Sequence, residues 1–143
     1  MNQQPETPTP PRRGYPSHPS FARGYERDSH DSARERFMEP LRREVVGLAR
    51  GRVLEIGAGN GLNFAFYAPE QVESVEATEP DNTMLGYARP RAQAARVPIH
   101  LVQAAAEHLP FEDESFDSAV VTLVFCSVDD PPRGLSEVQR VLN

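Results

Sequence analysis

The sequence predicts an α/β protein built around a parallel β-sheet. From residue 51 onward, short β-type runs alternate with amphipathic segments of helical length, and a glycine-rich turn directly follows the first run. Such alternation is typical of parallel strands joined by right-handed crossover helices. The length of 143 residues is that of one ordinary domain.

Each element is expected from its own local pattern. The β-type runs cover residues 53–56, 72–78, 99–102 and 119–125, and the run over residues 72–78 alternates apolar and acidic residues. The last run is the most apolar, so we expect a fully buried strand there, followed by a buried Cys126. Helices are expected over residues 62–68, 81–95 (disturbed at Pro90) and 131–142. The last helix should turn four apolar side chains inward: Leu135, Val138, Val141 and Leu142.

Residues 1–52 differ from the rest in charge and proline content. They carry ten arginines against seven acidic residues, whereas residues 53–143 carry five against fourteen. Six prolines in the first 19 residues predict a disordered tail over residues 1–17, with a polyproline ligand as the alternative. Residues 18–52 should be helical, with a capping box at Ser32 and Glu35. Their inward face is expected to hold Phe37, Leu41, Val45, Leu48 and Ala49. The Arg/Glu face should be solvated, or else meet an acidic partner.

The composition excludes several classes of protein. All 15 basic residues are arginine and the net charge is −6, so charge gives no reason to expect nucleic acid or an anionic membrane as partner. The longest near-apolar run has eight residues, against about 20 for a membrane span. A single cysteine cannot form an internal disulfide, which fits a cytoplasmic location. The four histidines show no metal-ligand spacing, so no metal is expected.

The stretch V-L-E-I-G-A-G-N-G-L-N is the most informative in the chain. Gly57, Gly59 and Gly61 follow the first strand, where glycines adopt positive φ and let a ligand approach the backbone. Glu79 stands 22 residues after Gly57, at the expected end of the second strand. A carboxylate there can accept both hydroxyls of a ribose, so the two features together predict a nucleoside site.

The glycine spacing indicates which kind of nucleoside binds. Dinucleotide folds use G-x-G-x-x-G, but here the spacing is G-x-G-x-G and Leu62 occupies the third-glycine position of the dinucleotide form. Glu55, two residues before the first glycine, would repel a pyrophosphate and attract an ammonium group. The pattern favours a ligand with ribose and an amine but no phosphates, and disfavours the rival reading of a nicotinamide dehydrogenase.

These features resemble the class I S-adenosylmethionine-dependent methyltransferases, in the branch of ubiquinone-pathway and thiol methyltransferase-like enzymes. Four motifs occur in order within residues 18–143: V-L-E-I-G-A-G-N-G, A-T-E-P-D-N-T-M-L, A-A-A-E-H-L-P-F followed by D-E-S-F-D, and V-V-T-L-V-F-C-S-V. The resemblance implies a Rossmann-like sheet of strand order 3-2-1-4. It also implies S-adenosyl-L-methionine as the cofactor.

The resemblance further implies a set of cofactor-binding residues. Glu79 would bind the ribose, Met84 would pack on the adenine, and the end of the fourth strand would face the methyl group. Ala105 departs from the family, because many relatives carry an acid there that can bond the adenine amino group. The full implied set is Glu55, Gly57, Gly59, Gly61, Glu79, Met84, Ala106, Glu107 and Thr122.

The implied reaction is methyl transfer to a small acceptor such as a thiol, phenol or quinone. Because the cofactor already carries the activation, no catalytic base is required and no catalytic residue is assigned. Groups that could take a proton from the acceptor are His18, Tyr25, Asp129 and Asp130.

The chain departs from the family in length. Relatives continue with a fifth strand, another helix and a final strand pair, whereas this sequence stops at Asn143. We therefore expect a C-terminally truncated domain over residues 53–143 that lacks the last three strands. A homodimer or strand-swapped assembly should cover the edge of the fourth strand. The alternative is a non-catalytic or partner-completed nucleoside-binding fragment.

Overall fold

The structure, a computed structural model, describes residue 15 and residues 17–143, so most of the predicted tail lies outside it. Four parallel strands form one sheet: β1 (Gly51–Ile56), β2 (Val72–Thr78), β3 (Ile99–Val102) and β4 (Ser118–Val121). Their order is β3-β2-β1-β4. Both the predicted α/β class and the predicted strand order are confirmed.

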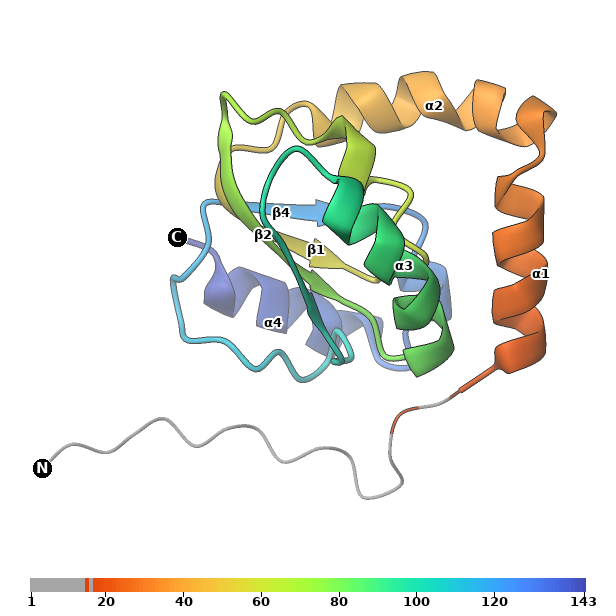
Figure 1. Cartoon of the computed structure of the whole chain (residues 1–143). Coiled ribbons are helices and arrows are strands. Elements are labelled where there is room, and N and C mark those ends of the chain that lie inside the picture. Colours follow the sequence, from red (N-terminus) through yellow and green to blue (C-terminus); the bar gives the residue numbers. More distant parts are fainter. Residues whose placement is uncertain (1–14, 16) are drawn as a thin grey trace, which may run out of the picture.

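Four helices surround the sheet: α1 (Pro19–Ser29), α2 (Ser32–Val46), α3 (Asn82–Ala94) and α4 (Pro131–Val141). Helices α3 and α4 lie on opposite faces of the sheet, and α1 stands beside the ends toward which the strands run (Figure 1). Among the described residues, no helix is long and apolar enough to cross a membrane.

The core has two halves, one on each face of the sheet. Val53 of β1 and Val75 of β2 belong to the half that also contains Ala88 of α3. Leu54 of β1 belongs to the other half, with Val141 of α4. Successive residues of a strand point to opposite faces, and helices cover both faces. Buried packing therefore fixes β1, and with it the glycine turn that follows.

The turn after β1 does not lead into the α-helix expected over residues 62–68. It leads into a single 3-10 turn, η1 (Phe64–Phe66), after which Tyr67 is extended. Pro69 disfavours helical backbone at Ala68, the residue before it, which accounts for the missing last residue of the expected helix.

The fourth strand is shorter and less buried than expected. It ends at Val121, and within it only Val120 is buried. Leu123 has a left-handed φ of 55°, which turns the chain into the 3-10 helix η2 (Phe125–Ser127). Cys126 is therefore exposed, and the prediction of a buried cysteine is wrong.

The inward face predicted for the N-terminal helical segment is also wrong. Helix α2 buries Arg42 and Val46, and Ala49 after it, but four of the five predicted side chains are exposed: Phe37, Leu41, Val45 and Leu48. The helix cap is Asp31, whose Oδ1 accepts a hydrogen bond from Ala33 N at 2.9 Å, so the capping box expected at Ser32 and Glu35 is also corrected.

The last two helices follow the prediction except at single positions. Helix α3 continues through Pro90 and shows no break there. In α4, Val141 is buried as expected, but Leu135 is 56% exposed.

Candidate functional site

Three strand ends meet at one level of the sheet. Ile56, the last residue of β1, pairs with Thr78 of β2 and with Val121 of β4. The residues that follow these positions are Gly57, Glu79 and Thr122. Open α/β sheets bind ligands beyond the carboxyl ends of their strands, so this level is the candidate site.

The glycine turn has the backbone that its sequence predicts. Gly57, Gly59 and Gly61 have φ values of 63°, 58° and 84°, which side chains other than glycine's rarely adopt. A Cβ added to Gly59 would meet no atom within 4 Å, so the space beside this residue is open. A Cβ added to Gly57 would overlap the side chain of Val124, which shows that the chain after β4 closes onto the turn.

Glu79 contacts the glycine turn directly. Its Oε2 accepts a hydrogen bond from Gly59 N at 3.0 Å, and its Oε1 accepts one from Asp81 N at 2.9 Å. Burial raises the pKa of Glu79, against the lowering effect of these two backbone bonds. A carboxylate offers about four lone-pair sites, so it can accept further hydrogen bonds from a ligand beside the turn.

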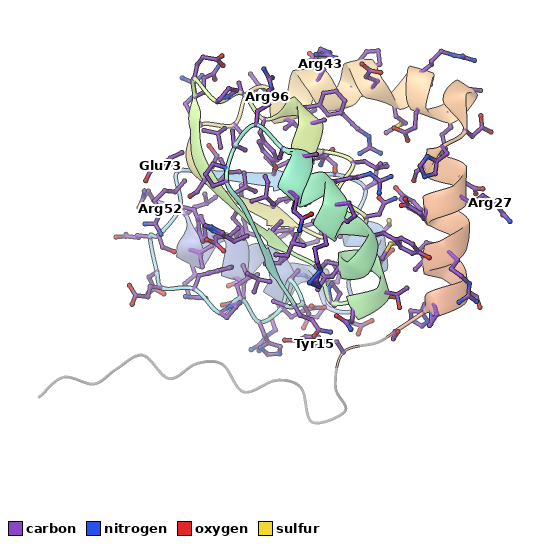
Figure 2. All side chains as sticks on the ribbon, viewed as in Figure 1. Tyr15, Arg27, Arg43, Arg52, Glu73 and Arg96 are labelled. Carbon is purple, nitrogen blue, oxygen red and sulfur yellow. The ribbon has the colours of Figure 1, made fainter. Side chains whose placement is uncertain are left out.

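Hydrogen bonds to Glu26 hold helix α1 against the same turn. The Glu26 carboxylate accepts hydrogen bonds from Asn60 Nδ2 at 2.7 Å and from Arg91 Nη1 and Nη2 at 2.8 and 3.0 Å. Burial opposes ionisation of Glu26, but the bonds from Arg91 and Asn60 outweigh it and lower its pKa. Arg27, the next residue, points away from the sheet into solvent (Figure 2).

His18, the residue before α1, makes a second link to the candidate site. Asp81 caps α3 by accepting from Thr83 N at 2.8 Å, and it also accepts from His18 N at 2.9 Å. Helix α1 therefore covers the site from the residues after β2 to the glycine turn. The sequence had suggested neither the long-range bonds of Glu26 nor the bond of His18, because each joins residues more than 30 positions apart.

Glu55 lies beneath the turn and is fully buried. Its Oε2 accepts a hydrogen bond from Tyr67 OH at 2.8 Å, and its Oε1 accepts one from Asn63 Nδ2 at 2.9 Å. Burial raises the pKa of Glu55 to about 7, although Tyr67, Asn63 and Arg42 all act to lower it. Both carboxylate oxygens are thus held by protein donors, and neither faces open space.

Asn63 joins three elements around Glu55. Besides its bond to Glu55, Asn63 Nδ2 donates to Thr122 Oγ1 at 2.9 Å, and Asn63 Oδ1 accepts from Arg42 Nη1 at 3.0 Å. Arg42 comes from α2, where the sequence had suggested a solvated charged face. Its burial was missed, because its partner lies 21 residues further along the chain.

The remaining predicted residues lie around these contacts. Met84 and Ala106 are each 6% exposed, and Ala106 packs in the core half that contains Leu54. Glu107 is half-buried, and its Oε1 accepts from Asp130 N at 3.0 Å.

The groups named as proton acceptors are spread over three segments. His18, Asp129 and Asp130 are exposed, whereas Tyr25 is half-buried. Asp130 is engaged as the cap of α4, because its side chain accepts from Arg133 N. Within the described part of the chain, no group of three or more His, Cys, Asp or Glu side chains could hold a metal ion.

Comparison with known proteins identifies relatives of this arrangement. Residues 54–143 match the family described as "Methyltransferase domain". The demethylmenaquinone methyltransferase of Clavibacter sepedonicus is 35% identical over 100 residues, which is 70% of this chain and 40% of the relative. The thiol S-methyltransferase TMT1B of Rattus norvegicus is 35% identical over 91 residues, or 63% of this chain and 37% of the relative. The chain therefore spans half or less of the length of these relatives.

Solved structures share the fold. A S-adenosylmethionine-dependent methyltransferase from Thermotoga maritima is 34% identical, with a TM-score of 0.66 over 87% of this chain and 55% of that one. A methyltransferase from Methanococcus maripaludis, at 20% identity, has a TM-score of 0.75 over 87% of this chain and 59% of that one. The second likeness shows the fold alone.

Proposed function

Because the chain belongs to the class I S-adenosylmethionine-dependent methyltransferases, we propose that it transfers a methyl group from that cofactor to a small organic acceptor. S-adenosyl-L-methionine is the cofactor of this family. The observation that carries the proposal is the contact between Glu79 and Gly59, which places a carboxylate with free lone pairs beside an open glycine turn.

The residues at the strand ends fit this cofactor. Glu79 can accept the ribose hydroxyls while it keeps its two backbone bonds, and the space beside Gly59 admits a ligand close to the backbone. Two acidic side chains near the turn, Glu55 and Glu79, disfavour a pyrophosphate. The proposed cofactor-binding set is unchanged: Glu55, Gly57, Gly59, Gly61, Glu79, Met84, Ala106, Glu107 and Thr122.

Glu55 acts differently from the rest of that set. Because its carboxylate is buried and held by Tyr67 and Asn63, it supports the turn from below. Above about pH 7, where it is ionised, it would attract the cofactor's ammonium group through its charge, without direct contact.

The cofactor supplies a methyl group on a positively charged sulfur. When the cofactor is bound, this group would pass to the acceptor's lone pair, and the carbon–sulfur electron pair would stay on sulfur. The protein's part is to align the two reactants and to keep water out. Helix α1, fastened across the strand ends by Glu26, is placed to exclude water from the site.

A thiol, phenol or quinone is the proposed class of acceptor. The printed names of two relatives contain "demethylmenaquinone" and "thiol", and a third relative, from Cereibacter sphaeroides, is named for phosphatidylethanolamine. The acceptors in these names are carbon, sulfur and nitrogen nucleophiles on organic molecules, which supports a small organic acceptor here.

A second copy of the chain, or a strand-swapped assembly, is proposed to cover the free edge of β4. Within the described residues, β4 forms its ladder only with β1. An unpaired strand edge in a sheet is normally covered or blunted. A partner-completed nucleoside-binding unit is the alternative function, and the unpaired edge of β4 among the described residues supports it.

Isothermal calorimetry with S-adenosylhomocysteine tests the proposal. The unaltered chain should bind it, and Glu79→Ala should weaken binding at least tenfold, because ribose hydrogen bonds to a carboxylate are lost. Glu73→Ala is the matched control, since Glu73 is an exposed acid on β2, the strand that Glu79 follows, and should leave binding unchanged. An unaltered chain that gives no heat with this ligand, or that binds NAD instead, would refute the proposal.

A further inference from the structure

The hydrogen-bond direction at Asn63 is fixed by Arg42. A guanidinium group can only donate, so the Asn63 atom that lies 3.0 Å from Arg42 Nη1 must be the carbonyl oxygen. The amide NH2 of Asn63 therefore points the other way, toward Glu55 and Thr122. The orientation of the Asn63 amide follows from this chemistry.

This direction decides what the Thr122 hydroxyl can do. Its oxygen accepts a hydrogen bond from Asn63 Nδ2 at 2.9 Å, so its own hydrogen must point away from Asn63. No acceptor among the described residues is hydrogen-bonded to that hydroxyl. Thr122 is half-buried and directly follows β4, level with Gly57 at the candidate site. It therefore offers a donor to whatever occupies the site.

The arrangement behind Thr122 is rigid. Arg42, Asn63 and Glu55 are 6%, 1% and 2% exposed, so water does not compete for their bonds. If the Asn63 amide turned over, its NH2 would face Arg42 and its oxygen would face Glu55. Buried polar groups without partners are costly, so this alternative is disfavoured.

Leu123, the next residue, adds an apolar surface. Its φ of 55° is left-handed, a conformation that is strained for leucine, and its side chain is 65% exposed. Strained residues persist where their surroundings hold them, often at binding sites. Two consecutive residues after β4 thus offer a hydroxyl donor and an exposed apolar side chain.

We propose that Thr122 donates its hydroxyl hydrogen to the nucleophilic atom of an apolar acceptor, in the form of a thiolate or phenolate. Asn63 and Arg42 are the positioning residues that set the direction of this donor. The inference rests on the proposed methyl transfer and names the acceptor's class. Hydrogen bonding to an anion stabilises its charged form, so the acceptor gives its proton to solvent more readily. Its lone pair then forms the bond to the methyl carbon, and Thr122 keeps its own proton throughout.

The test uses 4-nitrophenol as a probe, bound to the full chain with S-adenosylhomocysteine. Absorbance titration gives the pKa of the bound phenol in the unaltered chain, Thr122→Val and Thr122→Ser. We expect the unaltered chain to lower the phenol pKa by about one unit, corresponding to about tenfold tighter binding of the anion. Thr122→Val should abolish the shift, whereas Thr122→Ser, which keeps the hydroxyl, should restore it.

Calorimetry with S-adenosylhomocysteine on the same variants separates a role of the Thr122 hydroxyl toward the acceptor from a role toward the cofactor. Because Thr122 also belongs to the proposed cofactor-binding set, Thr122→Val is expected to weaken S-adenosylhomocysteine binding as well, so the phenol pKa, measured with this ligand at saturation, is the readout that decides the inference. Weaker cofactor binding in Thr122→Val with an unaltered phenol pKa would show that the hydroxyl serves the cofactor, and would overturn the inference. Absence of phenol binding to a complex that does hold S-adenosylhomocysteine would also overturn it. Failure of the unaltered chain to bind S-adenosylhomocysteine would instead refute the proposed function itself.

Discussion

Replacing Glu55 with glutamine should change how stability depends on pH. Burial raises the pKa of Glu55 from 4.5 to about 7 in the folded chain, whereas the unfolded chain keeps the ordinary value. Between these two pH values the folded chain retains a proton that the unfolded chain has lost. The contribution of Glu55 to the free energy of unfolding therefore falls as pH rises from 4.5 to about 7, and is level on either side.

The size of the effect follows from the pKa shift. A difference of about 2.5 units corresponds to about 3 kcal/mol of stability that is present below pH 4.5 and lost above pH 7. Glu55→Gln carries no ionisable group at this position, so its stability does not decrease in this way as pH rises. Stability of the wild type relative to the variant should thus decline by about 3 kcal/mol across the window.

Urea unfolding followed by circular dichroism, at several pH values from about 4.5 to about 8, measures this difference. Burial also raises the pKa of Glu79, but Glu79 titrates in both proteins and cancels in the comparison. A difference that stays flat, or that increases with pH, would refute the reasoning. It would show that Glu55 is ionised throughout, with the charge of Arg42 and the bonds from Tyr67 and Asn63 outweighing its burial.

Two further predictions concern the glycine turn and its cover. Gly59→Ala should lower the free energy of unfolding by about 1–2 kcal/mol, because alanine is strained at a φ of 58° even though its Cβ meets no atom; thermal unfolding checks this. Glu26→Gln should speed the association of S-adenosylhomocysteine in stopped-flow measurements, because weaker bonds to Arg91 and Asn60 let α1 open more often. Asp28→Asn, an exposed change on the same helix, is the control and should leave the rate unchanged; equal rates in all three proteins would contradict a covering role for α1.

The sequence predicts those parts of the fold that depend on local pattern. The limits of β2 follow from its alternation of apolar and acidic residues, and those of β3 from its apolar run. The meeting of Gly59 with Glu79 follows from parallel topology, which brings the ends of neighbouring strands together. Periodicity failed for α2, because a buried Arg42 and its partner Asn63 decide which side of the helix faces inward. No helical pattern contains that partner, since it comes from a turn 21 residues away. The roles assigned to the cofactor-binding residues stay predictions.

The long-range hydrogen bonds that hold α1 against the rest of the protein have a consequence for the order of folding. Its partners lie far along the chain: Asn60 is 34 residues from Glu26, Asp81 is 63 residues from His18, and Arg91 is 65 residues from Glu26. Contacts of such separation cost loop-closure entropy and form only after both partners have a fixed place. The glycine turn and α3 must therefore form before α1 can pack against them. Helix α1 is then expected to join the folded chain after the glycine turn and α3, and to leave it before them.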